Sequence, residues 1–477
     1  MRWWAFLLVA LSLVVPRRAI GATATFADAG EQATRTLLTV LYASVGAWRE
    51  CDLPACGSAT SDWGVDSQTY ALSLRWRTTG DRAIVPVLDA LAAHAPRYGA
   101  PCAAAPGCQA WSDTPSWDAV ALAREYEATG DQGALQAAAA AVQYVERSGA
   151  FVGGACPSIL YQRPHKPARV VKSLETEANL IKAEILLYRL TRDPSYLSSA
   201  VAHYKAAREA YLDPAVPLYT VHVIDDGIHC VPVDHRFFAS VNGDMIWNGL
   251  ALSHETGVDA YAGEAVATAH AVDDLLGDGR GVFVDAAGEN DVVEPLVEAM
   301  FVLADRPEGA FARAWIVRNA AAAISARAQD GTFARYFDGP AQVGTSAWQD
   351  NGGLALEIAA AALAPSMPID NNDDWASART LAPQLTTVPE TIAFDGSGIA
   401  LVGTLGRQCE HAHVRVFIDG TEIFDRTGLW TNSSMPGAGT PSVVFAWRWP
   451  TSGPHTLRLE PAVDDATDVH LQAYAIP

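Results

Sequence analysis

The sequence gathers carboxylates, amides and tryptophans in several short polar stretches, each leading into an Ala- and Leu-rich segment. Indole faces stack on the C–H faces of sugar rings, while carboxylates and amides hydrogen-bond to hydroxyl groups. This mixture favours a carbohydrate-binding site. The residues that we expect to contact such a substrate are Asp62, Trp63, Trp111, Trp117, His235, Asn242, Asp244, Trp247, Asn290, Asp291, Glu294, Trp348, Asp350 and Asn351.

Hydrolysis of a glycosidic bond needs two carboxyl groups, one as the acid and the other as the base or nucleophile. Asp113 is the candidate that a structural role explains least well. It is flanked by Trp111 and Trp117. It also precedes Pro115, the expected first residue of a helix, so it would lie at or before the N-cap. The candidates for the two catalytic roles are Asp113, Asp118, Glu175 and Glu177.

The second catalytic carboxyl has three candidates. Asp118 falls inside the first helical turn, where capping is weaker, and a buried carboxylate there would need a partner or a raised pKa. Glu175 and Glu177 are two residues apart, about 200° around a helix axis, so at most one of them can point into a central lumen. Glu177 could instead pair with Lys172 or His165.

Structural roles compete with the functional ones. Asp66, Asp244 and Asp291 begin helical segments, where Asp is a common N-cap. Residues 225–227, Asp-Asp-Gly, lie between two strand-like runs and favour a hairpin turn over a catalytic pair. The histidines on either side of this turn, His222 and His229, are then expected at the surface.

The elements that would position these residues form an irregular helical repeat. In each unit, a polar loop leads into an apolar helix, a tight turn follows, and a more charged helix comes after it. The first helices are expected at 66–78, 116–129, 174–190, 241–255 and 294–304. The second helices are expected at 82–95, 132–147, 196–212, 260–276 and 310–327. Two further helices, 346–362 and 31–48, complete a sixth hairpin.

Six hairpins that close head to tail predict an (α/α)6 toroid in a mainly α protein. The first helices form the inner ring, as their nearly uniform apolarity suggests. The long loops enter these helices at one end of the ring, so the candidate residues converge on one mouth. We place this domain at 25–363, a linker at 364–390 and a small β-sandwich at 391–477. The sandwich is expected from six runs of period-two alternation, with turns at 419–420 and 452–453.

Composition and the N-terminus limit the possible partners. The 477 residues carry 33 basic and 54 acidic side chains, a net charge of −21, which argues against nucleic acid or an anionic membrane as a partner. Residues 1–24 are typical of a signal peptide, so we expect a secreted or periplasmic monomer. Export permits disulfides, and Cys51–Cys56, Cys102–Cys108 and Cys156–Cys230 are the expected pairs. The cysteine spacing does not favour zinc, and we expect no metal or cofactor.

Three segments carry a family resemblance: SWDAVALAREYEATGD at 116–131, KSLETEANLIKAEILLYRLTRD at 172–193 and NGDMIWNGLALSHETG at 242–257. They resemble helices of the bacterial and fungal endo-α-1,6-mannanases of glycoside hydrolase family 76. The resemblance implies the (α/α)6 fold and matches Asp113 to the first of that family's two adjacent catalytic aspartates. Thr114 stands where the family has the second. Residues 394–475 resemble the galactose-binding-like jelly-roll modules of secreted glycosidases.

These observations lead to one main functional hypothesis and two alternatives. The main one is a secreted glycoside hydrolase that cleaves a polysaccharide by paired-carboxylate catalysis, with an α-mannan-type glycan as the candidate substrate. A polysaccharide lyase on the same toroid could use His235 and Arg236, although an acidic mouth disfavours an anionic uronate. The replacement of the second aspartate by Thr114 motivates the other alternative, a glycan-binding protein without catalytic activity.

Overall fold

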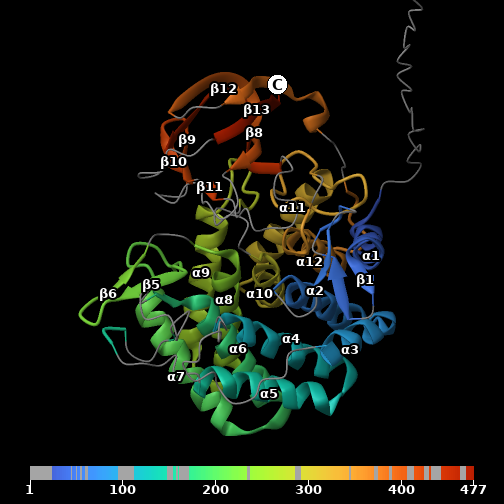
Figure 1. The fold of residues 1–477 in the computed structure, drawn as a ribbon, viewed down its shortest axis with the longest axis vertical. Helices are drawn as coiled ribbons and strands as arrows, with labels where there is room; N and C mark the ends of the chain where they lie inside the picture. The colour runs from blue at the N-terminus through green and yellow to red at the C-terminus, as the bar shows by residue number, and fades with distance from the viewer. Residues whose placement is uncertain are drawn as a thin grey trace, which may run out of the picture.

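The computed structural model describes a helical domain followed by a β-sheet domain (Figure 1). The residues that it describes are 24–44, 46–49, 51–53, 56–59, 63–94, 112–147, 154–156, 160, 171–233, 237–284, 292–342, 345–369, 374–385, 389–405, 413–423, 429–430, 442–461 and 469–476. None of the helices within these ranges is long and apolar enough to cross a membrane.

Twelve α-helices within the described residues form six hairpins, which confirms the predicted toroid. The inner helices are α2 (Trp63–Thr79), α4 (Asp113–Thr129), α6 (Leu174–Thr191), α8 (Ala239–Thr256), α10 (Glu294–Ala304) and α12 (Ala347–Leu363). Their outer partners are α3 (Val85–His94), α5 (Gln132–Arg147), α7 (Pro194–Tyr211), α9 (Asp259–Leu275), α11 (Ala310–Ser325) and α1 (Phe26–Thr36). Each inner helix packs against the inner helices before and after it, and α12 packs against α2, so the ring closes.

The tight turns between paired helices follow from their residue types. Gly130 and Gly257 end α4 and α8 with φ angles of 76° and 71°, a left-handed conformation that glycine adopts without strain. Arg192 takes the same place after α6 with a φ of 62°. Asp193 then caps α7 by accepting a hydrogen bond from the Ser195 amide at 2.9 Å. These short turns keep all the long connections at the opposite end of the ring.

The helix expected at 31–48 is wrong in its second half. Thr25 caps α1 through a capping box with Asp28, so the helix begins earlier than expected. It ends in a single π-helical turn, Leu37–Leu41, and the chain then turns back at Gly46, whose φ is 70°. A small sheet follows, formed by β1 (Tyr42–Ser44), β2 (Ala47–Arg49) and β3 (Ser58–Ala59).

A second small sheet borders the start of α6. It contains β4 (Val171–Ser173), β5 (His222–Asp225) and β6 (Cys230–Pro232). The β5–β6 hairpin confirms the turn predicted at 225–227. The disulfides Cys51–Cys56 and Cys156–Cys230 are present as predicted. Cys102, Cys108 and Cys409 lie outside the described residues.

The C-terminal strands form one antiparallel sheet in the order β10-β9-β12-β8-β13-β7, with β11 paired to β9. Its strands are β7 (Arg379–Leu385), β8 (Glu390–Leu405), β9 (His413–Ile418), β10 (Thr421–Ile423), β11 (Leu429–Trp430), β12 (Ser442–Pro461) and β13 (Val469–Ile476). The Asp419-Gly420 turn is confirmed, with positive φ at both residues. Strand β7 falls inside the segment expected as a linker, and the domain boundaries stay predictions.

The turn predicted at 452–453 is wrong, because these residues lie within the single long strand β12. The pairing of β12 with β8 shifts between Arg448 and Gly453, so several residues of β12 oppose a much shorter stretch of β8. Pro450 falls in this irregular segment, where the absence of an N–H group is tolerated. Glycine and proline therefore mark a bulge here rather than a reversal of the chain.

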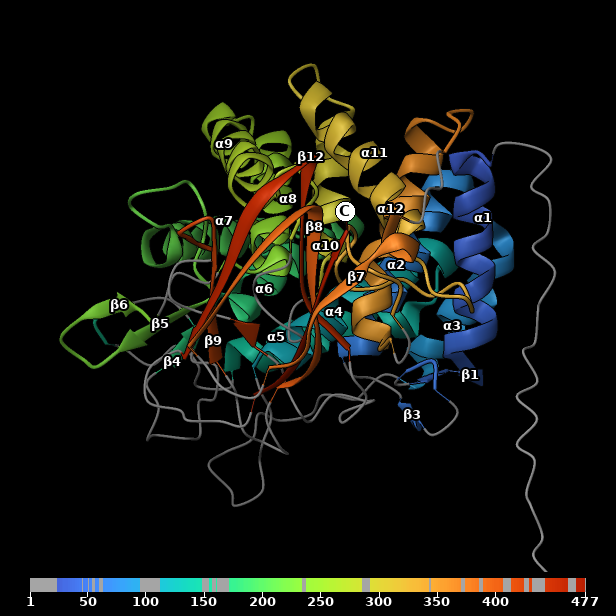
Figure 2. The same cartoon turned by 90° about the horizontal axis from the view of Figure 1, so that it is seen from above.

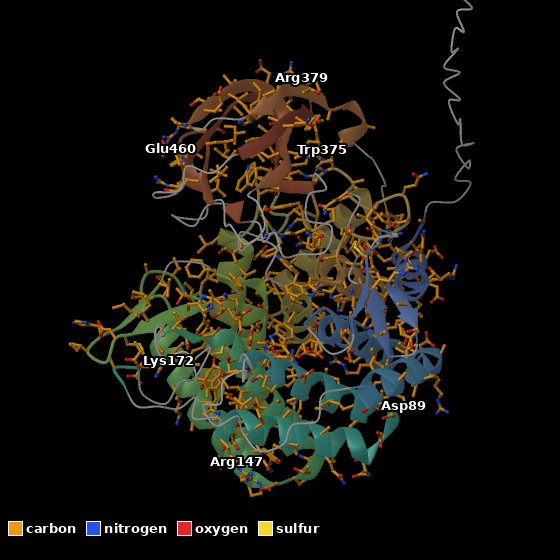
Figure 3. All side chains as sticks on the ribbon, in the orientation of Figure 1. Asp89, Arg147, Lys172, Trp375, Arg379 and Glu460 are labelled. Atoms are coloured by element: carbon orange, nitrogen blue, oxygen red, sulfur yellow. A yellow bond between two sulfur atoms is a disulfide. The ribbon has the colours of Figure 1, made fainter. Side chains whose placement is uncertain are left out.

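The sheet lies against one side of the helical domain, above it in Figure 1 and in front of it in Figure 2. The Tyr336 hydroxyl donates to the carbonyl of Val444 at 2.8 Å. The indole N–H of Trp375, which is labelled in Figure 3, donates to the carbonyl of Asp338 at 3.1 Å. Val443 and Ala446 of β12 pack with Tyr336 in an apolar cluster between the domains. The sheet therefore packs against residues of the helical domain that lie outside its helices, such as Val284 and Tyr336.

Candidate active site

Asp113 is the first residue of α4, directly after the N-cap Ser112, and its side chain is buried. Its Oδ1 accepts a hydrogen bond from the Thr114 amide at 3.0 Å. At 100° per residue, Asp113 shares a helix face with Arg124. Arg124 reaches Glu298 on the opposite inner helix α10 at 2.5 Å, so this face borders the lumen. Asp113 therefore lies on the lumen side of α4, at the end where the inner helices begin.

Asp118 lies on a different face of α4, about 140° from Asp113. Together with Asp66 and Glu125 it lines a cavity of about 20 Å³ between α2, α3 and α4. The cavity is bordered otherwise by apolar side chains such as Val65 and Leu91. The structure thus places Asp118 within the wall of the ring and not beside Asp113.

Of the two glutamates at the start of α6, only Glu175 shares a face with Lys182, whose amine reaches α8 and α10 across the lumen. The Oε2 atom of Glu175 is 3.4 Å from the Ser173 hydroxyl and 3.9 Å from Nε2 of His222. Its side chain keeps 14% of its surface exposed. Glu175 is thus a partly exposed carboxylate on the inner helix next to that of Asp113.

Glu177 faces the outer side of α6, in agreement with the expectation that only one of the pair points inward. It is fully buried and accepts the amide of Leu160 at 3.2 Å. Burial raises its pKa to about 8, although the charge of His203 on α7 opposes this shift. The proposed partner Lys172 binds Asp225 instead, at 3.1 Å, and His165 lies outside the described residues.

The expectation that both hairpin histidines lie at the surface is correct for His229 and wrong for His222. His229 is exposed and pairs with Asp226 at 3.0 Å. His222 is held against the start of α6 because β4 and β5 pair Ser173 with His222, and its side chain is only 14% exposed. The pairing register of a three-residue strand thus adds an imidazole to the neighbourhood of Glu175.

Asp225 has a structural role at the base of the hairpin. It accepts hydrogen bonds from the amides of Ala155, Cys156 and Gly227 at 2.9–3.0 Å. Although burial opposes ionisation, these amides and Lys172 lower its pKa to about 2. The carboxylate therefore fixes the loop around residues 154–156 rather than acting on a substrate.

Below the mouth, a network of charges crosses the lumen. Lys182 pairs with Asp244 at 2.9 Å and with Glu298 at 2.7 Å, while Arg124 and Arg77 reach Glu298 at 2.5 and 2.8 Å. Burial alone would raise the pKa of Glu298, but the three cations hold it well below its usual range. We call these five residues the floor of the lumen. Asp244, expected as a substrate ligand or cap, is instead buried in an ion pair.

Glu294 precedes Glu298 by one helical turn and lies on the same face of α10. Its side chain is fully buried, and neither carboxyl oxygen has a hydrogen-bond partner among the described residues. Burial and the charge of Glu298 raise its pKa to about 8. Glu294 is therefore a protonated carboxyl at neutral pH, directly above the floor.

The tryptophans expected as stacking surfaces differ in their exposure. Trp117 is 2% exposed and stacks on Tyr70, with ring centroids 5.3 Å apart. Trp247 is 3% exposed, and its ring is covered by Lys182 and two arginines at 5.2–5.4 Å. Both therefore belong to the packed interior. Trp348, in the first turn of α12, stays partly exposed.

The remaining candidates that the structure describes, other than Asp66, form hydrogen bonds between the first turn of an inner helix and the backbone of another segment. Asn242 exchanges two hydrogen bonds with the backbone of Tyr219, at 2.8 and 3.0 Å. Asp350 accepts the amide of Phe333 at 2.9 Å, and burial raises its pKa to about 7. Asn351 accepts the amide of Glu294 at 3.1 Å. The side chain of Trp63 and the residues Asp62, Trp111, His235, Asn290 and Asp291 lie outside the described part.

Sequence reasoning missed the three cations of the floor and the aromatic Tyr70. Lys182 lies 5.6 Å from the ring of Tyr70, whose hydroxyl donates to the carbonyl of Trp117 at 2.8 Å. A signal was available, because a charged residue inside an otherwise apolar inner helix needs a buried partner. Periodicity does not identify which helix supplies that partner.

No known family model matches the sequence, and no curated protein matches it either. Solved structures are similar in fold. The GH76A α-1,6-mannanase of Salegentibacter sp. HEL1_6 has a TM-score of 0.60 at 18% identity, over 71% of this chain and 99% of that chain. Its inactive variant with two adjacent aspartates replaced by asparagine, in complex with α-1,6-mannotriose, has a TM-score of 0.61 at 18% identity and the same coverage. Dfg5 of Chaetomium thermophilum, in complex with glucosamine, has a TM-score of 0.56 at 13% identity, over 72% of this chain and 92% of that chain. The resemblance found in the sequence is thus confirmed for the fold.

Proposed function

We propose that the chain is a glycoside hydrolase whose active site lies at the mouth of the helical ring. The observation that carries this proposal is the placement of Asp113 and Glu175. They occupy the first turns of the neighbouring inner helices α4 and α6, and both lie on lumen faces. Cleavage of a glycosidic bond requires two carboxyl groups that can reach the same bond, and two on one side of a lumen meet this requirement. The shared fold with α-1,6-mannanases supports the proposal.

In this proposal, one carboxyl protonates the departing glycosidic oxygen, and the other activates water or attacks the anomeric carbon. Asp113 is one of the pair. Glu175 takes the second role, since the hydroxyl of Thr114 is too weak an acid and too weak a base for it, and Asp118 and Glu177 face away from the lumen. Ser173 and His222 lie beside Glu175 and can orient its carboxylate.

We further propose an α-mannan-type substrate and a site of action outside the cytoplasm. The first rests on the mannanases that share the fold, one of which binds α-1,6-mannotriose. The second rests on the signal-like residues 1–24 and on two disulfides, which form readily in oxidising compartments. A lyase is not favoured, because the similar structures with a named activity are glycoside hydrolases.

The test is release of reducing ends from α-mannans and other cell-wall glycans by the purified protein. Asp113→Asn and Glu175→Gln should each lower the rate by about 10²–10⁴-fold, the usual contribution of a general acid or base. Their Tm values should stay close to that of the unsubstituted protein. Glu209→Gln, an exposed change on α7, is the matched control and should leave the rate unchanged.

Three results would contradict parts of the proposal. If Asp113→Asn lowers the Tm strongly but the variant that remains folded keeps its rate, Asp113 is only a structural residue of α4. If Asp118→Asn or Glu177→Gln abolishes turnover while Glu175→Gln does not, the second carboxyl is assigned wrongly. If the protein binds a glycan but releases no reducing ends from any of them, it is a binding protein, as the replaced aspartate would allow.

A further inference from the structure

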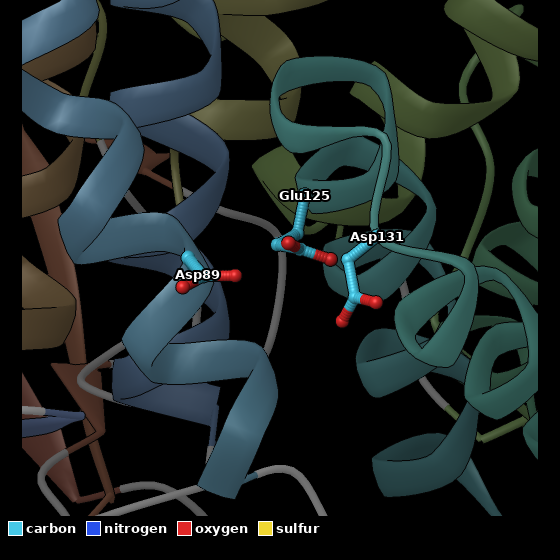
Figure 4. A group of neighbouring side chains, drawn as sticks. All are labelled: Asp89, Glu125 and Asp131. Atoms are coloured by element: carbon cyan, nitrogen blue, oxygen red, sulfur yellow. The ribbon is translucent and has the colours of Figure 1, made fainter.

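A second group of carboxylates lies at the opposite end of the ring from the mouth, where the hairpin turns are. Asp89 comes from α3, Glu125 from the end of α4, and Asp131 from the turn between α4 and α5. One oxygen from each carboxylate lies within 4.8 Å of the others. The three side chains point toward one another from three separate elements (Figure 4).

Glu125 is the buried member of this group, and its exposed fraction is 1%. Its Oε1 accepts a hydrogen bond from the Thr129 hydroxyl at 2.5 Å, but its buried Oε2 has no partner among the described residues. Burial raises the pKa of Glu125 to about 7, the Thr129 bond opposes this, and the charges of Asp131 and Asp89 add to it. A buried oxygen left without a donor is costly unless something else binds it.

The charges of the group are not balanced by the protein. No described Lys, Arg or His forms an ion pair with Asp89, Glu125 or Asp131. Three carboxylates at this spacing repel one another unless a proton or a cation intervenes. Asp131 cannot easily move away, because its Oδ1 accepts the Gly133 amide at 2.9 Å at the start of α5.

We propose that Asp89, Glu125 and Asp131 bind a Ca²⁺ ion that ties α3 to the α4–α5 turn. Ca²⁺ binds carboxylate oxygens at about 2.3–2.6 Å, so two of its ligands can lie up to about 5.2 Å apart. The observed spacing falls within that limit. Mg²⁺ demands near-ideal octahedral geometry and usually keeps several of its waters, so three carboxylates from separate elements suit Ca²⁺ better. A donor set of oxygens alone also suits a hard cation better than a soft one.

The surroundings leave room for the water ligands that complete such a site. Asp89 and Asp131 are exposed, so solvent reaches the outer side of the ion. On the inner side, Glu125 borders the cavity of about 20 Å³ between α2, α3 and α4, which is enough for one water molecule. The site is separate from the mouth and does not depend on the proposed function.

In the experiment, CaCl₂ is titrated into the full chain after treatment with EDTA, and the heat of binding and the Tm are measured. We expect one bound Ca²⁺ per chain and a Tm that rises by a few degrees as the ion saturates the folded state. Asp89→Asn and Glu125→Gln should weaken binding at least tenfold and abolish the Tm rise.

Asp193→Asn is the matched control. Asp193 caps α7 in the turn after α6 as Asp131 caps α5 in the turn after α4, but no other carboxylate joins it in a comparable group among the described residues. This variant should bind Ca²⁺ as the unsubstituted chain does. The proposal is overturned if the EDTA-treated chain shows neither heat nor a Tm rise with Ca²⁺. It is equally overturned if Asp89→Asn, an exposed change that should not affect folding, binds Ca²⁺ undiminished.

Discussion

At the scale of single residues, the lumen shows how environment divides identical side chains into different roles. Glu298 and Glu294 are one turn apart on α10, yet three cations hold the pKa of Glu298 low, while burial and Glu298 itself raise that of Glu294 to about 8. In the proposed function, Asp113 and Glu175 at the mouth are the carboxyls that act on the substrate. Residue type alone could not predict this division, because it depends on which helices face each other.

The raised pKa of Glu294 predicts a specific pH dependence of stability. A glutamate in an unfolded chain has a pKa near 4.5, whereas Glu294 holds its proton up to about pH 8 in the folded state. Between these values the folded state binds more protons than the unfolded state, so stability falls as the pH rises. Glu294→Gln should remove this fall. The variant should gain free energy of unfolding, relative to the unsubstituted chain, as the pH goes from about 5 to about 9.

Urea unfolding at several pH values measures this difference. Other buried carboxyls, such as Glu177, contribute to the overall slope in both proteins and cancel in the comparison. Glu308→Gln, an exposed change on the turn after α10, serves as the control and should not alter the slope in that range. Parallel curves for Glu294→Gln and the unsubstituted chain would show that Glu294 is ionised in the fold.

At the scale of elements, the sequence predicted what depends on local pattern. Apolar runs, Gly130 and Gly257 at turns, and Asp at N-caps located five hairpins to within a few residues, whereas the helix expected at 31–48 ends far earlier than expected. Errors arose where local signals are ambiguous. Ser452-Gly453 looks like a turn, but its pairing with β8 makes it a bulge. The buried partners of Trp247 and Asp244 could not be predicted for a similar reason, since they come from other helices of the ring.

The junction between β4, β5 and the loop at 154–156 gives a prediction at this scale. Lys172 is fully buried, binds Asp225 at 3.1 Å and donates to the carbonyl of Cys156 at 2.5 Å. Lys172→Met leaves the Asp225 carboxylate buried without its cation, although its amide donors remain. We expect a loss of about 2–4 kcal/mol in the free energy of unfolding, somewhat below the usual cost of breaking a buried pair.

A double-mutant cycle separates the ion pair from the general effect of each change. Asp225→Asn keeps much of the side-chain shape, so the Lys172→Met/Asp225→Asn double variant should recover part of the loss, with a coupling of about 1–3 kcal/mol. Urea denaturation measures all four proteins. Strictly additive losses would mean that Lys172 acts through packing alone and that the ion pair contributes nothing.

At the scale of the whole molecule, Arg448 is one of the side chains that connect the sheet to the helical ring. Arg448 of β12 lies 3.6 Å from Asp338 and 2.8 Å from Asp374, and its amide donates to Asp278 at 3.2 Å. Burial and the charge of Asp338 raise the pKa of Asp278 to about 7, so the interface keeps two carboxyls close together. Arg280 on the helical side also pairs with Asp338, at 3.2 Å.

Arg448→Met should therefore weaken the coupling between the two domains without unfolding either, although the apolar cluster around Tyr336 remains. The guanidinium is 9% exposed, and its removal leaves the Asp338 charge with Arg280 as its only cationic partner among the described residues. We expect the calorimetric trace to change from one unfolding transition to two, because each domain keeps its own apolar core. Arg458→Met is the control, since Arg458 lies on the same strand, pairs with Glu460 and makes no ion pair with the helical domain among the residues that the structure describes. A single transition shifted equally in both variants would show that Arg448 stabilises the sheet itself and does not couple it to the ring.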